Sequence, residues 1–133
     1  LHTFTAEVIV ASLACGLVID ALLMVNNFRD RDTDRLSGKN TLVVRIGWRA
    51  ALWLYLALGV LACLMGALFL QSGRWLAFVL PIVAYLPLHV LTFHKMKRID
   101  HGRELNGCLG DTSRNITVYG ITVAAGIMAA CFI

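Results

Sequence analysis

The chain has 133 residues, of which 59% are hydrophobic and 15% are charged, and its formal net charge is +4. This composition is typical of an integral membrane protein and excludes a soluble domain with a large core. The cations alternate with apolar stretches and acids instead of forming one basic stripe, so we expect no nucleic-acid partner.

Four apolar stretches are each close to the roughly 20 residues that a helix needs to cross hydrocarbon. They occupy residues 8–25, 50–70, 75–93 and 116–133. With their polar flanks, we expect helices at about 5–36, 48–70, 75–95 and 112–133. The predicted fold class is therefore all-α, a multi-pass membrane helical bundle with four transmembrane helices in the lipid bilayer.

Capping residues predict where the first and last helices end. We expect the first helix to start near Phe4 or Thr5 and to continue to about Leu36, where the following Ser-Gly pair is a common helix stop. Asp111 or Thr112 is expected to cap the last helix. Small residues at three- and four-residue spacing predict close helix packing in the second and fourth spans. They are Gly59, Cys63, Gly66, Gly120, Ala124 and Ala125.

The twelve cations are distributed unevenly over the connecting segments. Six lie around the first connection and five around the third, and only Arg74 lies in the short middle turn. The positive-inside rule assigns the cation-rich side to the cytoplasm, so that both ends of the chain are expected to face outward.

The segment between the first two spans reads NNFRDRDTDRLSGKNTLVVRIG and concentrates polar chemistry at one place. If the first helix continues through it, Asn26, Asp30 and Asp34 stand one turn apart and Asn27 lies near Asp30, so these four side chains project to one side. Asp32 points away. Mg²⁺ prefers one or two carboxylates together with substrate phosphates and water. The segment therefore predicts a Mg²⁺ and diphosphate site.

Asp20 is a carboxylate inside the first predicted span. By helical rise it lies about 21 Å deeper than Asp34. A carboxylate at this depth costs several kcal/mol unless it is protonated, paired or facing water, so Asp20 is a functional-site candidate. The alternative is a protonated or hydrogen-bonded packing residue.

Two further segments lie on the same side as the aspartates. The segment from Lys39 to Gly47 is predicted to be an interfacial amphipathic piece, with a short strand as the alternative, and it could present Lys39 and Arg45 to a phosphate. The last polar loop supplies residues that either help to close the site or carry only topogenic charge. The weaker candidates around the site are Arg35, Arg103, Asn106 and Arg114.

The segment that begins at Asn26 resembles the second aspartate-rich motif of the UbiA-type intramembrane prenyltransferases. In the branch that acts on 1,4-dihydroxy-2-naphthoate this motif reads NNxRDxxTDxxxGKxTLxVRxG. The run ELNGCLGDTSRN before the last apolar stretch also looks like the final loop of the family, so the resemblance covers nearly the whole chain. Such enzymes have nine transmembrane helices and one aspartate-rich motif in each half. The resemblance implies that residues 1–133 are the C-terminal half of such a domain, its last four helices.

The resemblance also implies roles for individual residues. Asp30 and Asp34 become the catalytic Mg²⁺ ligands. Diphosphate binding is assigned to Asn26, Asn27, Lys39 and Arg45. The implied activity is Mg²⁺-dependent transfer of a polyprenyl group from its diphosphate to an aromatic quinone precursor, 1,4-dihydroxy-2-naphthoate in menaquinone biosynthesis. The implied location is a bacterial inner membrane, with the aspartate-rich loop on the cytoplasmic side.

One feature departs from the family pattern. The first aspartate-rich motif is absent, since the acids before Asn26 are only Glu7 and Asp20. We therefore expect the chain alone to be inactive, because only half of the metal site is present, and we expect the missing N-terminal half of the same enzyme as its partner.

Three other interpretations remain open at this stage. The enzyme could prenylate another aromatic acceptor, such as homogentisate or hydroxybenzoate. Membrane CDP-alcohol phosphotransferases also place DxxxD on a membrane helix, but their DGxxAR run does not occur here. A transporter subunit could use Asp20 to relay protons or bind a cation.

Overall fold

The computed structural model describes residues 5–132, and the regular structure in this range is helical. The helices are α1 (Ala6–Arg29), α2 (Arg31–Leu36), α3 (Leu42–Ile46), α4 (Trp48–Met65), the 3₁₀ helix η1 (Gly66–Leu70), α5 (Trp75–Ile99) and α6 (Leu105–Ala129). The predicted all-α fold class is confirmed.

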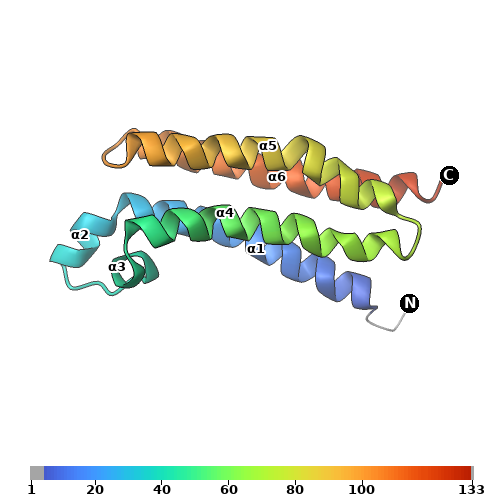
Figure 1. Cartoon of the computed structure of the whole chain (residues 1–133), viewed down its shortest axis with the longest axis horizontal. Coiled ribbons are helices and arrows are strands. Elements are labelled where there is room, and N and C mark those ends of the chain that lie inside the picture. Colours follow the sequence, from blue (N-terminus) through green and yellow to red (C-terminus); the bar gives the residue numbers. More distant parts are fainter. Residues whose placement is uncertain (1–4, 133) are drawn as a thin grey trace.

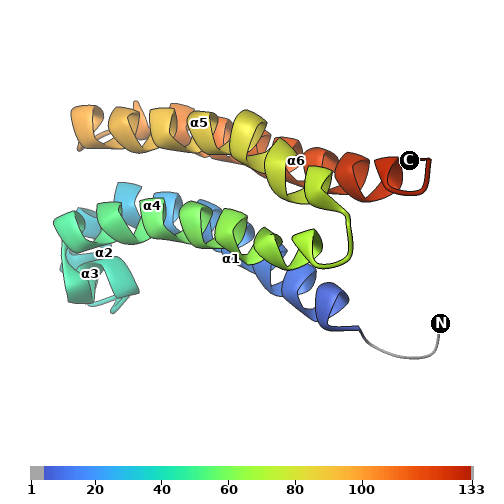
Figure 2. The ribbon, with the colours of Figure 1, turned by 45° about the vertical axis from the view of Figure 1, so that its right-hand side comes forward.

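Four long helices, α1, α4, α5 and α6, run side by side along the long axis of the molecule (Figures 1 and 2). Packing contacts join α5 to α6, α1 to α4, α1 to α6 and α4 to α5. The short helices α2 and α3 lie at one end together with the α5–α6 loop, whereas the start of α1 and the end of α6 lie at the other (Figure 1). The aspartate-rich segment therefore sits at one end of a bundle.

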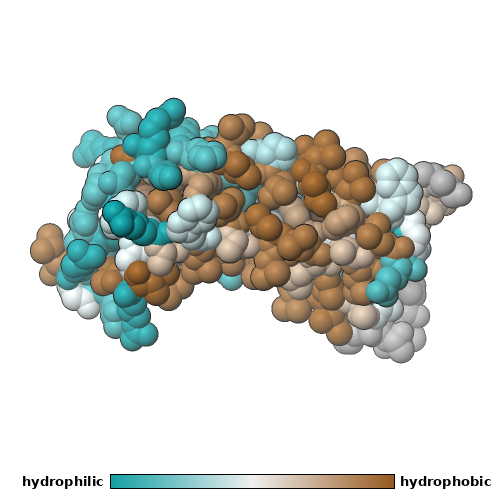
Figure 3. Space-filling view, viewed as in Figure 1, coloured by the Kyte–Doolittle hydropathy of each residue, from teal (hydrophilic) through white to brown (hydrophobic). Residues whose placement is uncertain are grey.

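Three segments are long and apolar enough to cross a membrane: Ala6–Arg29, Trp48–Leu70 and Trp75–Ile99. They confirm three of the four predicted spans. Helix α6 is as long as α5, but its first eleven residues read LNGCLGDTSRN and are polar. The surface reflects this division, because apolar side chains cover the middle of the molecule and hydrophilic ones gather over the end formed by α2, α3 and the α5–α6 loop (Figure 3).

The first predicted helix is broken. Helix α1 begins at Ala6, capped by Thr5, and ends at Arg29; Asp30 then leaves the helical region with φ −92° and ψ 6°. Helix α2 restarts at once and ends at Leu36, as predicted. The prediction of one uninterrupted helix was wrong because Asp30 adopts a turn geometry between two helical segments. The alternative start at Phe4 lies outside the described residues.

The last predicted helix begins seven residues earlier than expected. It starts at Leu105, so Asp111 and Thr112 lie inside the helix and neither caps it. Both have other partners: Asp111 Oδ2 is 2.8 Å from Lys95 Nζ, and the Thr112 hydroxyl is 2.9 Å from that of Tyr55. The prediction failed because partners on other helices satisfy side chains that would otherwise cap a helix. Residue 133, the predicted end, lies outside the described range.

The segment after the aspartates forms a short helix and not the alternative strand. In α3 the Thr41 side chain accepts a hydrogen bond from Val44 N at 3.3 Å, which caps the first turn. Gly47 ends the helix with φ 87°, a conformation that side-chain-bearing residues rarely adopt. Val43 is buried, whereas Leu42, Arg45 and Ile46 are exposed, so the helix buries a single side chain fully.

Buried polar side chains link the helices in the middle of the bundle. His89 donates from Nε2 to the carbonyl of Tyr55 at 2.9 Å, and Asn115 Nδ2 donates to Thr92 Oγ1 at 3.1 Å. With the contact between Tyr55 and Thr112, these bonds join α4, α5 and α6. Within the described residues, no fully buried side-chain nitrogen or oxygen lacks a partner. Such pairing is required where no water is present to satisfy polar groups.

Two glycines allow close helix contacts. A Cβ on Gly59 would lie 2.3 Å from the His89 ring, and a Cβ on Gly126 would lie 2.4 Å from the Ala77 backbone nitrogen. The predicted role of Gly59 in packing is thus confirmed. Gly120, also predicted to pack closely, has nothing within 4 Å of its would-be Cβ. The close contact of α6 occurs instead at Gly126.

We expect Gly126→Ala to destabilise the protein by about 1–3 kcal/mol, because the new methyl group meets the backbone of α5, which must move away. Gly120→Ala is the matched control on the same helix and should be neutral or slightly stabilising, since alanine favours helix by up to about 1 kcal/mol. Thermal unfolding in detergent micelles measures both. Equal midpoints for the two variants would contradict the packing argument.

Candidate functional site

The candidate site lies at the polar end of the bundle, where α1 gives way to α2. Asp30 occupies the break between the two helices, and Asp34 lies in α2. The backbone N–H of Asp34 donates to the Asp30 carbonyl at 2.8 Å, so the two aspartates remain one helical turn apart despite the break. The sequence spacing is therefore preserved in the backbone.

Arg29 connects Asp30 to its surroundings. It donates from Nε to Asp30 Oδ1 at 2.8 Å and from Nη2 to Asp30 Oδ2 at 3.0 Å. The same guanidinium donates to the side-chain oxygens of Asn26 at 2.7 Å and Asn106 at 3.0 Å. Arg29 thus contacts the predicted site residues Asn26 and Asp30 and the weaker candidate Asn106, although Arg29 itself was not predicted as a site residue. The only available signal for it was its position beside Asp30.

The environment keeps Asp30 ionised. The hydrogen bonds from Arg29 lower the pKa of Asp30 below its usual range; partial burial opposes this shift, and the charges of Arg29 and Lys39 add to it. Lys39, predicted to bind phosphate, is therefore close enough to act on Asp30 electrostatically. An ionised carboxylate is the form that binds a hard cation.

We expect Arg29→Gln to raise the pKa of Asp30, because the largest cause of its lowering is removed. The folded-state pKa is depressed, so the pair stabilises the protein above the usual carboxyl range, and this contribution is lost as pH falls through the lowered pKa. Infrared titration of the protonated carboxyl band measures the midpoint. Lys39→Gln should give a smaller shift in the same direction; a larger shift than Arg29→Gln would contradict the assignment.

Asp34 differs from Asp30 in its exposure. It is 9% exposed, whereas the Asp30 side chain is 37% exposed. Among the described residues its carboxylate forms no ion pair, while its carbonyl accepts from Lys39 N at 2.8 Å and from Ser37 Oγ at 3.1 Å. These backbone contacts fix the end of α2 and bring Lys39 back toward the aspartates.

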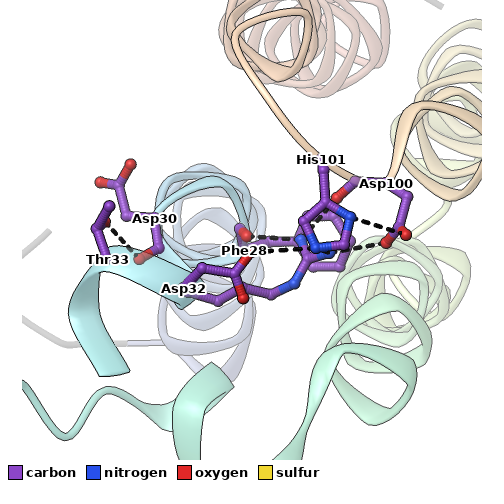
Figure 4. Close-up of polar contacts among 7 residues, drawn as sticks. Phe28, Asp30, Asp32, Thr33, Asp100 and His101 are labelled. Atoms are coloured by element: carbon purple, nitrogen blue, oxygen red, sulfur yellow. Dashed lines mark hydrogen bonds and ion pairs between the residues drawn. The ribbon is translucent and has the colours of Figure 1, made fainter. Parts of the chain in front are cut away.

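Asp32 takes part in a different set of contacts. Its Oδ2 lies 3.1 Å from His101 Nε2, and the carboxylate is turned away from Asp30 (Figure 4). The expectation that Asp32 points away agrees with this arrangement relative to Asp30.

Among the described residues, the remaining candidates form no hydrogen bond or ion pair with the Asp30 side chain. Arg114 lies 3.8 Å from Asp111 and donates to Asn115 at 3.2 Å, so its described contacts stay within α6. Asn27 is half-buried, and Asp20 is exposed on α1 about 15 Å from Asp30 by helical rise. The candidates Arg35, Lys39, Arg45, Arg103 and Arg114 are all exposed.

The donor set fits a shared Mg²⁺ site. The described residues contain no group of three or more His, Cys, Asp or Glu side chains placed to hold a metal ion. Asp30 and Asp34 supply two carboxylates, and Mg²⁺ completes such a set with phosphate oxygens and water. The chemistry of these two carboxylates suits Mg²⁺ shared with a diphosphate, but they do not form a self-contained metal cage.

The bundle of apolar helices carries a DxxxD segment and flanking cations at one polar end. Residues 2–106 match the UbiA prenyltransferase family, and the chain belongs to this family. Together with its three apolar spans, this makes it an integral membrane protein.

Curated relatives carry a common name. The chain is 30% identical over 122 residues to the 1,4-dihydroxy-2-naphthoate octaprenyltransferase of Mycobacterium leprae (strain TN), covering 92% of the chain and 40% of the relative. It is 52% identical over 46 residues to the enzyme of that name from Escherichia coli (strain K12), covering 35% of the chain and 15% of the relative. The chain thus spans at most two fifths of these relatives. No solved structure shows significant similarity to it.

Proposed function

We propose that the chain is the C-terminal part of a Mg²⁺-dependent membrane prenyltransferase that acts on an aromatic quinone precursor. The observation that carries the proposal is Asp30, hydrogen-bonded by Arg29, with Asp34 one helical turn later, at the polar end of an apolar bundle of this family. The names of the relatives favour 1,4-dihydroxy-2-naphthoate as the acceptor and menaquinone biosynthesis as the role.

The proposed reaction joins an isoprenoid chain to a ring. The allylic C–O bond breaks and its electron pair leaves on the diphosphate. The ring carbon that bears the carboxylate forms the new C–C bond, and CO₂ then departs, which restores the aromatic ring. Bound Mg²⁺ would neutralise charge on the departing diphosphate.

The chain's own residues would bind and orient the diphosphate. Asp30 and Asp34 would hold the ion, while Lys39 and Arg45 would attract phosphate oxygens and stabilise the leaving charge. The side-chain amides of Asn26 and Asn27 would donate hydrogen bonds. Arg29 donates two hydrogen bonds to Asp30, and it would be a further cation able to attract the phosphate oxygens.

We further propose that α6 is a fourth transmembrane helix, whose apolar part begins at Ile116. The polar end would then face the cytoplasm, because eleven of the twelve cations lie around it. The membrane would be a bacterial inner membrane, as suits relatives from bacteria.

The partner proposed for the chain is the N-terminal half of a nine-helix enzyme. Asp20 is exposed on α1 inside an apolar span. A carboxylate facing lipid at this depth is costly, so this face of α1 requires cover by protein or a water-filled cavity. Helices of the N-terminal half would provide that cover, and Asp20 would face the cavity between the halves.

The direct test is turnover by the complete enzyme, meaning this chain joined to its N-terminal half. With Mg²⁺, octaprenyl diphosphate and 1,4-dihydroxy-2-naphthoate we expect a demethylmenaquinone, identified by mass spectrometry; EDTA should stop turnover and Mg²⁺ should restore it. Faster turnover of hydroxybenzoate or homogentisate would show that the proposed acceptor is wrong and that one of these compounds is the substrate. Absence of prenylation, with proton flux into liposomes that depends on Asp20, would favour the transporter interpretation.

A further inference from the structure

Arg31 is a buried cation beside the aspartate pair, and it is only 3% exposed. Its Nη1 donates to the carbonyl of Phe28 at 2.9 Å and to that of Asp100 at 2.7 Å, while Nη2 donates to Asp100 Oδ1 at 2.8 Å. The guanidinium carbon lies 4.3 Å from the centroid of the Phe28 ring. A buried charge is costly unless it is paired and fully hydrogen-bonded, so these contacts hold Arg31 in one geometry.

The partner of Arg31 lies in the loop between α5 and α6. Asp100 has φ 64°, and it is the only non-glycine residue with positive φ in the described range. With ψ −51°, this backbone lies outside the left-handed helical region and is rare for a residue with a side chain. The second oxygen of Asp100 lies 3.0 Å from His101 Nδ1, and His101 in turn contacts Asp32 (Figure 4). The α5–α6 loop is thus joined to α2 by the contacts of Asp100 with Arg31 and of His101 with Asp32.

Asp30 lies between two arginines in the sequence, and both arginines contact residues where α5 ends and α6 begins. Arg29 bonds to Asn106 at the start of α6, and Arg31 bonds to Asp100 at the end of α5. The break at Asp30, with φ −92° and ψ 6°, is therefore tied down on each side. The contact of Arg29 joins residues 77 positions apart in the sequence, and that of Arg31 joins residues 69 positions apart. Together they hold the backbone that carries the Asp30 carboxylate.

We propose that Arg31 is a positioning residue: with Asp100 and His101 it forms a loop clamp that fixes the break at Asp30 and so presents Asp30 and Asp34 to the diphosphate. The clamp geometry stands on the contacts above. Its consequence for substrate binding rests on the proposed function.

The first test measures the clamp without substrate. Arg103 is exposed in the α5–α6 loop, so trypsin cleavage after Arg103 reports local opening of this loop. In the purified chain we expect Arg31→Gln and Asp100→Ala each to raise the cleavage rate about tenfold, and the double variant to exceed either by less than about twofold, because one shared contact is lost. Arg98→Gln, an exposed arginine at the end of α5, is the matched control and should leave the rate unchanged.

Asp100→Asn keeps the proposal testable if Arg31→Gln fails to fold. Asparagine retains a side-chain oxygen for Arg31 and tolerates positive φ. We expect its cleavage rate to stay within about threefold of the wild-type rate, a difference of under 1 kcal/mol. Unchanged cleavage in Asp100→Ala, or additive effects in the double variant, would overturn the clamp.

The second test separates positioning from general stability. In the complete enzyme we expect Arg31→Gln and Asp100→Ala to raise the KM for polyprenyl diphosphate about tenfold and to change the KM for the aromatic acceptor less than about twofold. Equal rises in both values would overturn the positioning role. A wild-type enzyme without turnover would contradict the proposed function alone, because proteolysis reports the clamp independently.

Discussion

Replacing Asp30 or Asp34 with alanine is expected to lower kcat/KM of the complete enzyme by about 10³-fold, on the order of 4 kcal/mol of transition-state stabilisation. Each change removes one of the two carboxylates that we propose as Mg²⁺ ligands at the break between α1 and α2. Without that ligand the charge of the departing diphosphate is less well compensated. Steady-state kinetics and Mg²⁺-dependent binding of a non-hydrolysable diphosphate analogue measure the loss.

The matched control for both variants is Glu104→Ala. Glu104 is an exposed carboxylate at the same polar end, and it forms no ion pair among the described residues. Its removal alters the local charge by the same amount, so its kcat/KM should stay within about threefold of wild type. Analogue binding that is indifferent to Asp30→Ala and Asp34→Ala would refute the proposed metal site.

The isolated 133-residue chain is expected to show no detectable prenyl transfer, even with Mg²⁺ and both substrates present. Two carboxylates do not complete a metal cage, and the described residues add no third ligand to them. The face of α1 that carries Asp20 is also uncovered, so water has access to a site where a reactive allylic cation must be protected.

Restoring activity by adding the N-terminal half would establish that the two parts form one active site. Mixing the two chains in detergent should yield prenylated product, and the same mixture with Asp34→Ala in this chain should not. Circular dichroism must show that the isolated chain is helical in both experiments. Turnover by the isolated chain alone would show that the second aspartate-rich motif is sufficient, and it would refute this prediction.

The long helices of the bundle were predictable because they depend on the local amino-acid composition. Apolar stretches of span length predicted α1, α4 with η1, and α5, since hydrocarbon demands continuous apolar helices. The DxxxD spacing predicted one helical turn between Asp30 and Asp34, and the hydrogen bond between their backbones confirms that spacing.

The break at Asp30 was not predictable, because its contacts come from distant parts of the chain. The partner of Arg31 is Asp100, and that of Arg29 is Asn106. The helical propensity of a local stretch does not reveal which distant residues it will contact. The same tertiary control explains Gly126, whose close neighbour Ala77 lies on another helix.

The early start of α6 has a similar cause. The run LNGCLGDTSRN contains capping residues and two glycines, which locally favour a loop before Asp111. Three of its residues, Leu105, Cys108 and Thr112, are nevertheless buried at helical spacing. Burial of this face extends the helix through a segment whose composition alone argues against it.

The buried bonds at mid-bundle limit how this part of the protein can move. Sliding α5 along α4 by one turn would break the bond of His89 and drive its imidazole away from Gly59, and sliding α5 along α6 would break the bond of Asn115. In an anhydrous setting those groups would find no replacement partners. Helices α4, α5 and α6 therefore form a unit of fixed register, to which α1 adds no buried side-chain hydrogen bond of this kind among the described residues.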